Sequence, residues 1–290
     1  MKNPILLTGG SGQVGGAIAQ IAAIRGIEVC APDREQLNLT DRESLVSAIA
    51  ARPWLAVINC AAYTAVDKAE SEVELAEALN ARAPAIMAEE TGRLNIPLIH
   101  VSTDYVFDGA KMSPYVENDI VNPLGVYGRT KEAGEAAIRA INSNHAIIRT
   151  AWVLSGGGQN FLNTMLRLGA ERPEIKVVDD QLGCPSNADD IASTLLTVAL
   201  ELGERSGTWH FVNSGEASWY ELARYIFAET SQRGLPTPSL VPISTAEYLT
   251  PAKRPANSRL ATAALTRDFS VKPRPWQQAV SEILSDRLTQ

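Results

Sequence analysis

The sequence has few of the residues that cross-link small secreted domains or bind metals. It contains three cysteines, Cys30, Cys60 and Cys184, which are far apart and form no Cys-x-x-Cys pair. An odd number of scattered cysteines predicts free thiols in a reducing cytoplasm, not a disulfide framework. The three histidines lack metal-ligand spacing, so we expect no metal site.

Long hydrophobic runs are also missing. The apolar stretch near the N-terminus, Ile5-Leu6-Leu7, ends at a glycine cluster, so we expect neither a secretory signal nor a membrane span. Positive charge is scarce as well, with 26 Lys and Arg against 33 Asp and Glu and a net charge of −7. This balance argues against nucleic-acid and anionic-membrane partners and leaves a small-molecule ligand as the expectation.

The first half of the chain alternates short apolar runs with helical patterns. Strands are expected at residues 5–8, 28–31, 55–59, 97–102 and 146–149. A capping box from Thr40 to Glu43 is expected to open the second helix, and a long helical pattern covers about 67–92. Buried strands that alternate with helices predict a Rossmann-type, doubly wound parallel α/β sheet.

The second half is less regular and predicts a smaller C-terminal α/β lobe. It has helical patterns at 189–202, 219–230 and from about 276, with a proline-rich stretch at 236–255. We assign residues 1–152, with roughly 188–212, to a dinucleotide-binding domain. Residues 153–187 and 213–290, again roughly, are assigned to a substrate-binding lobe.

A glycine-rich turn follows the first expected strand and precedes the first expected helix. Its glycines fit both G-x-G-x-x-G and G-x-x-G-x-x-G spacing. Such glycines allow a tight turn and a close backbone approach to a pyrophosphate, while the helix N-terminus favours the anion. The turn therefore predicts NADPH or NADH binding through Gly9, Gly12 and Gly15.

The second expected strand is followed by an acidic and a basic residue, Asp33 and Arg34. Asp33 is placed to bind the adenine ribose 2′-hydroxyl, and Arg34 is placed to bind a 2′-phosphate. The two residues point to opposite cofactors, so the choice between NADH and NADPH stays open. A solvated turn is the other interpretation of this pair.

Tyr127 and Lys131 are spaced to share one helix face, because residues i and i+4 lie one turn apart. A nearby ammonium lowers the pKa of a phenol, which could then exchange a proton with a carbonyl or alcohol oxygen. Taken alone, the pair is also what an ordinary exposed helix face would show.

Thr103 follows the fourth expected strand and could hydrogen-bond a carbonyl oxygen or cap a local turn. Ala61 and its neighbours follow the third strand at the same rim, where they would line the cofactor.

A hydrolase is a competing interpretation. The segment Gly9-Gly10-Ser11-Gly12-Gln13 begins like a nucleophile elbow but lacks the glycine in its fifth position, and none of the histidines is an evident base. We therefore do not expect hydrolase chemistry.

Taken together, these segments resemble extended short-chain dehydrogenases/reductases and, more narrowly, the dTDP-4-dehydrorhamnose reductase family. The resemblance rests on five blocks that run from the first residues to about 260. They are Gly12-Gln13-Val14-Gly15, Thr64 to Glu70, Tyr127 to Lys131, Arg149 to Val153, and Arg254 to Leu260.

The resemblance implies roles for individual residues. Thr103, Tyr127 and Lys131 would be catalytic, with Lys131 lowering the pKa of Tyr127 and holding the nicotinamide ribose. The dinucleotide would contact Gly12, Gln13, Val14, Asn38, Leu39, Ala62, Tyr63 and Thr64. A dTDP-sugar would contact Thr103, Asp104, Tyr127, Trp152, Arg254, Asn257 and Arg259. For Trp152 core packing is the other interpretation, and for the two arginines a solvated loop.

The implied activity is NAD(P)H-dependent reduction of the 4-keto group of dTDP-4-dehydrorhamnose to dTDP-L-rhamnose. Gly16-Ala17 stands where some family members carry an acid that helps to hold a dimer-bridging metal, so we expect a monomer or weak homodimer. Two alternatives stay open. One is another nucleotide-sugar epimerase, dehydratase or reductase. The other is a non-catalytic, dinucleotide-binding regulatory subunit of the methionine adenosyltransferase type.

Overall fold

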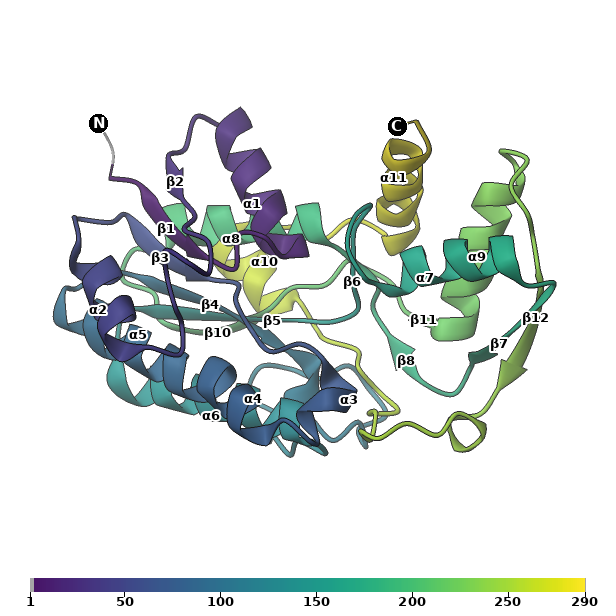
Figure 1. Cartoon of the computed structure of the whole chain (residues 1–290), viewed down its shortest axis with the longest axis horizontal. Helices are drawn as coiled ribbons and strands as arrows, with labels where there is room; N and C mark the ends of the chain where they lie inside the picture. Colours follow the sequence, from purple (N-terminus) through teal and green to yellow (C-terminus); the bar gives the residue numbers. More distant parts are fainter. Residues whose placement is uncertain (1–2, 290) are drawn as a thin grey trace.

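A parallel sheet of six strands forms the centre of the computed structural model, which describes residues 3–289 (Figure 1). Every neighbouring pair of strands in the sheet is parallel. The predicted doubly wound α/β fold is therefore confirmed. The order across the sheet is β2 (Val29–Cys30), β1 (Ile5–Thr8), β3 (Ala56–Asn59), β4 (Leu98–Thr103), β5 (His145–Thr150) and β10 (Gly207–His210).

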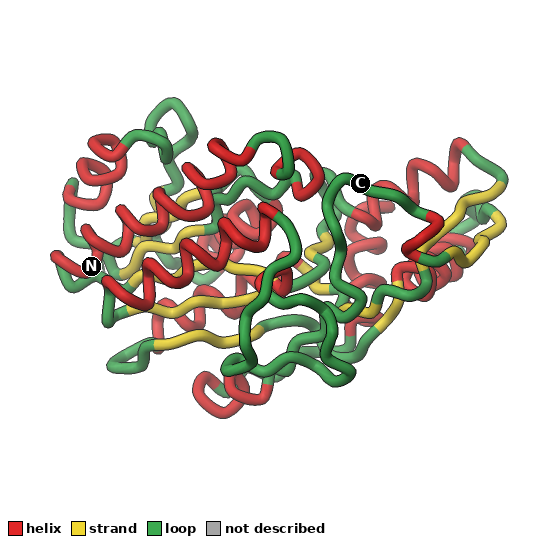
Figure 2. Tube along the Cα trace, turned by 90° about the horizontal axis from the view of Figure 1, so that it is seen from below, coloured by secondary structure: helices red, strands yellow, loops and turns green. Residues whose placement is uncertain are grey.

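Helices cover both faces of this sheet, as the two perpendicular views show (Figures 1 and 2). The apolar core on one face includes side chains of α1 (Gln13–Ile24), α8 (Ala188–Glu201) and α10 (Ala263–Phe269). The core on the other face includes side chains of α2 (Arg42–Ala50), α5 (Ala83–Arg93) and α6 (Val126–Ile141). Burial of β1, β3, β4 and β5 between two helix layers explains their nearly continuous apolar sequences.

Two helix predictions need correction. The N-cap of α2 is Asp41, whose carboxylate accepts a hydrogen bond from the backbone N–H of Glu43 at 2.9 Å. The expected capping box from Thr40 is therefore wrong, because the cap lies one residue later. The pattern at 67–92 is also not one helix. It divides into α3 (Val66–Ala69), α4 (Val73–Glu77), a π-helical turn η1 (Ala78–Arg82) and α5.

A second apolar core lies beside the carboxyl ends of the sheet strands. It is built from α7 (Phe161–Glu171), α9 (Trp219–Ser231), α11 (Trp276–Thr289) and the parallel pair β7 (Glu174–Val178) and β12 (Ser239–Ile243). The predicted capping box of Ser218 and Glu221 at the start of α9 is confirmed. Two short pairs complete this region, β6 (Val153–Leu154) with β9 (Ser186–Asn187), and β8 (Leu182–Gly183) with β11 (Ala217–Ser218).

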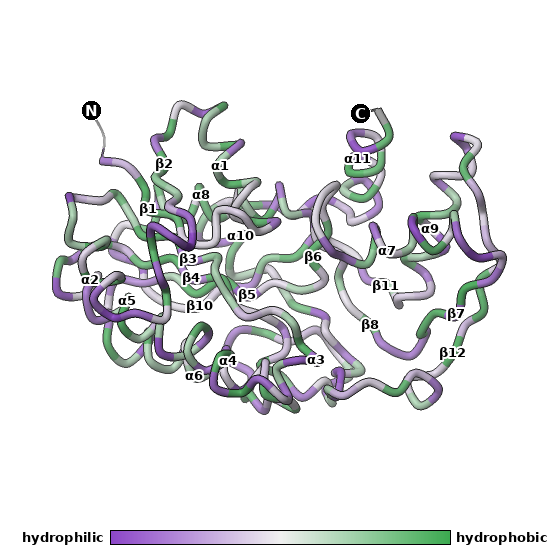
Figure 3. The backbone as a smooth tube through the Cα atoms, viewed as in Figure 1, coloured by the Kyte–Doolittle hydropathy of each residue, from purple (hydrophilic) through white to green (hydrophobic). Residues whose placement is uncertain are grey.

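The chain passes between the two cores more than once. After the loop at 250–260, Leu265 and Phe269 of α10 return to the core of the central sheet. Hydrophobic residues recur along the central strands (Figure 3). Within residues 3–289, no helix is both long and apolar enough to cross a membrane.

The strand order reverses between β1 and β3, since β2 extends the sheet in one direction and β3 to β10 extend it in the other. In open α/β sheets the loops beyond such a reversal form the ligand crevice. The glycine-rich turn follows β1 and the segment from Cys60 follows β3, so both reach this point. The fold therefore brings the predicted cofactor residues to one rim.

Candidate active site

The turn after β1 is tightly packed and leaves no room for a side chain at Gly9 or Gly15. Gly9 has a φ of 75°, and a Cβ there would lie 2.6 Å from the backbone nitrogen of Ala61. A Cβ on Gly15 would lie 2.1 Å from the carbonyl oxygen of Gly9. Gly12 begins α1 without a side-chain cap from any described residue, so the first N–H groups of the helix can receive an anion.

Gln13 joins this turn to the C-terminal region. Its side-chain oxygen accepts hydrogen bonds from the Ser155 hydroxyl at 2.6 Å and from the Asn160 amide at 2.8 Å. Val14, the next residue, packs against the core on the α1 face of the sheet. The predicted cofactor turn is thus held in place by residues from both halves of the chain.

The end of β2 keeps both cofactor interpretations possible. Asp33 is exposed, and its Oδ1 accepts hydrogen bonds from the backbone N–H groups of Glu35 and Gln36. Its second carboxylate oxygen makes neither of these bonds, and Arg34 beside it is exposed. Asn38 is exposed and Leu39 is half-buried in the following loop. These residues lie on one continuous segment after β2, but their cofactor contacts stay a prediction.

The segment after β3 is fixed by Asn80, a buried residue of the π-helical turn. The Asn80 side-chain oxygen accepts from the backbone N–H of Tyr63, and its amide donates to the Tyr63 carbonyl and the Thr130 hydroxyl. Ala61 and Ala62 are half-buried and Thr64 is exposed. The π-helical turn therefore places Asn80 between the predicted cofactor segment and α6.

Tyr127 and Lys131 lie one turn apart on α6, and Thr103 ends strand β4, which packs against that helix. Burial raises the pKa of Tyr127 to about 12, while a hydrogen bond with Thr103 acts in the opposite direction. The Thr103 hydroxyl also donates to Asp104 at 3.0 Å. Tyr105 packs edge-on against the Tyr127 ring at 5.4 Å between centroids. The phenol is therefore protonated at neutral pH and can act as an acid.

The expectation that Lys131 lowers the pKa of Tyr127 is not met in this structure. The Lys131 Nζ lies 3.1 Å from His100 Nε2 and donates to the Val101 carbonyl at 2.7 Å, so the amine is directed toward β4. Burial lowers the pKa of Lys131 to about 8. The helix spacing was correct, but partners on the neighbouring strand decide where the amine lies.

Asp104 is buried and Trp152 is half-buried. Burial raises the pKa of Asp104 to about 6, against hydrogen bonds from Ser258 and Thr103. No described residue gives Asp104 Oδ2 a hydrogen bond of normal geometry. Trp152 has a positive φ of 48° and stacks on Trp219 with 3.4 Å between ring centroids. Trp152 therefore packs partly as a core residue, and its contact with a sugar stays a prediction.

The predicted cationic loop is already paired with acids. Arg254 forms an ion pair with Asp67 at 2.9 Å, and Arg259 pairs with Glu216 at 2.8 Å. The Asn257 amide donates to the carbonyls of Lys111 and Ser113. These residues therefore hold loops together, and anion binding by the arginines would require them to exchange partners.

Three features of the site were not expected from the sequence. His100 contacts Lys131 from the buried strand β4. Glu70 accepts a hydrogen bond from the Val126 N–H at 2.7 Å and so caps the helix that carries Tyr127.

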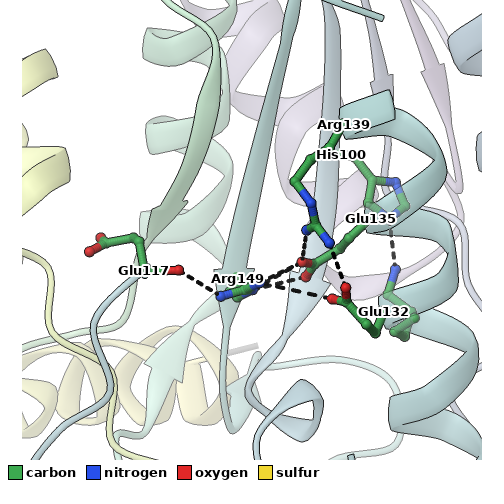
Figure 4. A network of polar contacts seen from close by, with 7 residues as sticks. His100, Glu117, Glu132, Glu135, Arg139 and Arg149 are labelled. Carbon is green, nitrogen blue, oxygen red and sulfur yellow. Dashed lines mark hydrogen bonds and ion pairs between the residues drawn. The ribbon is translucent and has the colours of Figure 1, made fainter. Parts of the chain in front are cut away.

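The third feature is a network of charged residues. It links Arg149 of β5 to Glu135 of α6 at 2.6 Å, with Arg139, Glu132 and the carbonyl of Glu117 around it (Figure 4). Glu70 lies in a block used for the resemblance, but nothing local to the sequence pointed to His100.

Known proteins are similar in sequence to this protein over nearly the whole chain. The family model described as "RmlD substrate binding domain" matches residues 1–289. The chain belongs to this family. One curated relative is the dTDP-4-dehydrorhamnose reductase of Sinorhizobium fredii. It is 42% identical over 286 residues, which cover 97% of this chain and 96% of the relative.

Solved structures with the same name are similar in fold. The dTDP-4-dehydrorhamnose reductase of Clostridium acetobutylicum is 36% identical with a TM-score of 0.93, and all of both chains is covered. The one from Bacillus anthracis, solved in complex with NADP, is 31% identical with a TM-score of 0.92 and covers 99% of this chain and 100% of its own. The family assignment made from the five sequence blocks is confirmed, and so is the predicted Rossmann-type fold.

Proposed function

We propose that this protein is an NAD(P)H-dependent dTDP-4-dehydrorhamnose reductase, which converts dTDP-4-dehydrorhamnose to dTDP-L-rhamnose. The observation that carries the proposal is the hydrogen bond between Tyr127 and Thr103, on the helix that also bears Lys131, in a sheet whose strand reversal presents the glycine-rich turn. Full-length similarity to enzymes of this name supports the substrate, and the NADP-bound relative supports the cofactor.

The residues fit a bound dinucleotide. The uncapped first turn of α1 would receive the pyrophosphate, and the segment after β3 would lie along the cofactor. When bound, the reduced nicotinamide supplies the hydride. Asp33 and Arg34 would face the adenine ribose, so we expect NADPH and NADH to be distinguished there. Lys131 would hold the nicotinamide ribose once its present contacts rearrange.

Proton transfer then falls to Tyr127. Its raised pKa keeps the phenol protonated at neutral pH, and an alkoxide forming at the sugar C4 oxygen is basic enough to take that proton. The Thr103 hydroxyl would stabilise the same oxygen. Asp104 and Trp152 would position the sugar ring, and Arg254 and Arg259 would bind the diphosphate after exchanging partners.

We extend the proposal to the organisation of the protein. Residues 1–152 with roughly 188–212 would bind the dinucleotide, and roughly 153–187 with 213–290 would bind the dTDP-sugar, although α10 packs on the sheet of the first unit. The protein would act without a metal as a monomer or weak homodimer. Three free thiols support a reducing compartment, the cytoplasm.

The test is turnover with the proposed substrate. Purified protein is mixed with dTDP-4-dehydrorhamnose and either NADPH or NADH, and the loss of reduced-nicotinamide absorbance is followed together with the formation of dTDP-L-rhamnose. We expect substrate-dependent loss and the rhamnose product. Tight cofactor binding without any turnover would contradict the proposal and favour a dinucleotide-binding regulatory protein.

A further inference from the structure

A chain of buried polar groups connects the end of β1 to Lys131. Thr8, Asn59, His100 and Lys131 are each no more than 2% exposed. The distances between consecutive polar atoms are 2.6 Å from Thr8 to Asn59, 3.0 Å from Asn59 to His100 and 3.1 Å from His100 to Lys131. Three neighbouring strands and α6 contribute one member each, so the chain crosses the sheet beneath the cofactor rim.

The direction of these hydrogen bonds can be worked out from one end. The backbone N–H of Ala61 lies 3.1 Å from Asn59 Oδ1, and a backbone N–H can only donate. The Thr8 hydroxyl donates to the same oxygen. The orientation of the Asn59 amide is therefore fixed, and its NH₂ group faces His100.

The amide orientation determines the tautomer of His100. Asn59 Nδ2 donates to His100 Nδ1, so Nδ1 must carry the lone pair and the proton of the neutral ring must lie on Nε2. The ring is neutral because burial, followed by the proximity of Lys131, holds the pKa of His100 well below its usual range. The Nε2–H group then points at Lys131.

A donor aimed at Lys131 Nζ requires a lone pair there. A neutral amine can accept from His100 Nε2–H while donating to the Val101 carbonyl at 2.7 Å. An ammonium would instead place N–H against N–H. We propose that His100 is a positioning residue whose tautomer, set by Asn59, favours the uncharged amine of Lys131 over the ammonium.

The groups around Lys131 agree with this inference. The Cys60 thiol after β3 is neutral, since burial raises its pKa to about 12. Glu135, one turn further along α6, favours the ammonium, but it is itself paired with Arg149. Tyr127, one turn before, is a protonated phenol. Burial outweighs Glu135 and lowers the pKa of Lys131 to about 8.

The consequence for the proposed reaction is a lysine whose charge responds to pH near neutrality. The ammonium is present below the lowered pKa and is lost as the pH rises through it. If the ammonium stabilises the Tyr127 phenolate left after proton transfer, turnover falls above about pH 8, where an ordinary lysine, with a pKa of about 10.4, would stay charged. This consequence rests on the proposed function, whereas the charge state of Lys131 does not.

The charge can be measured without turnover. The chain has seven lysines, and in cofactor-free protein labelled with ¹³C-lysine the Lys131 Cε resonance is identified by its absence in Lys131→Arg. We expect a titration midpoint near 8 for Lys131 in the wild type. In His100→Gln the side-chain carbonyl can accept from the ammonium, so the midpoint should rise by about one unit or more.

A second variant tests the role of Asn59 in case His100→Gln folds poorly. Asn59→Asp accepts at both oxygens, moves the His100 proton to Nδ1 and frees Nε2 to accept from an ammonium, so the Lys131 midpoint should also rise. Thr8→Val is the matched control, because Ala61 still orients Asn59 and the midpoint should stay within about 0.3 units.

Three results would overturn the proposal. These are a wild-type midpoint near 10, a midpoint unmoved by both His100→Gln and Asn59→Asp, or a rise in Thr8→Val as large as in the other two. Loss of reductase activity in the substrate assay would leave these titrations unchanged, so the two proposals fail separately.

Discussion

The region around α6 and the loop at 250–260 both place charged residues at the proposed site, but in different ways. Beneath α6, Arg149 and Glu135 have side chains 3% and 0% exposed and are held by several hydrogen bonds. In the loop, the Arg254 and Asp67 side chains are 24% and 37% exposed. The buried charges are locked in one geometry, whereas we expect the half-buried pair to exchange partners with less loss. The structure thus fixes the charges around the proposed proton donor, whereas those of the proposed anion-binding loop are more exposed.

The largest expected effect comes from breaking the buried pair. Arg149→Ala leaves Glu135 buried without its main partner, and we expect a loss of about 3–5 kcal/mol in the free energy of unfolding. Urea unfolding followed by circular dichroism measures this loss. Arg139→Ala is the control, because Arg139 also contacts Glu135 but is 37% exposed, and it should cost about 1 kcal/mol or less. Equal losses in the two variants would remove the distinction between the regions.

The second prediction concerns Asp104, whose ionisation destabilises the folded protein. Its pKa is raised to about 6 from 3.8, so its ionisation disfavours folding above pH 6, and this cost disappears as the pH falls below 4. Asp104→Asn should therefore stabilise the protein at pH 7.5 by up to about 3 kcal/mol, from roughly 1.4 kcal/mol for each of about two units. Unfolding curves at pH 7.5 and pH 4 measure the change. A stabilisation of the same size at both pH values would contradict burial of the carboxylate as its cause.

The half-buried pair of Arg254 and Asp67 should give a smaller effect, which appears in substrate binding. Arg254→Ala is expected to raise KM for the dTDP-sugar about tenfold, roughly 1.4 kcal/mol, with little change in stability. Asp67→Asn should not raise KM, because it frees Arg254 from its resting partner. Steady-state kinetics with both variants separates these outcomes. A similar rise in KM for both would show that the ion pair is needed intact and that its partners do not exchange.

The sequence alone predicted the strands and turns that carry the proposed site, because their signals are local. The glycine turn, the strand ends and the four-residue spacing of Tyr127 and Lys131 can each be seen within a few residues. The strand expected at 97–102 is observed at Leu98–Thr103. The cap of α2 was missed by one residue, since Thr40 and Asp41 are both good N-cap residues and only the backbone decides between them.

Contacts between distant residues could not be predicted in this way. His100 lies 31 residues from Lys131 and appears in the sequence as a single histidine in an apolar strand. Asp67 and Arg254 are 187 residues apart, so their pairing depends on how the C-terminal loop returns to the sheet. The pKa of Tyr127 also differed from expectation, because burial by the folded chain raises it and contacts with β4 direct the Lys131 amine toward the strand.

The central claim is that Tyr127 is the proton donor in an NAD(P)H-dependent reduction, and Tyr127→Phe tests it most directly. The substitution removes one hydroxyl from a half-buried ring. Turnover of dTDP-4-dehydrorhamnose and the Kd for NADPH are measured on the same preparation. We predict that kcat falls by a hundredfold or more, about 3 kcal/mol, while the NADPH Kd changes by less than about threefold. Wild-type turnover in Tyr127→Phe would contradict the account.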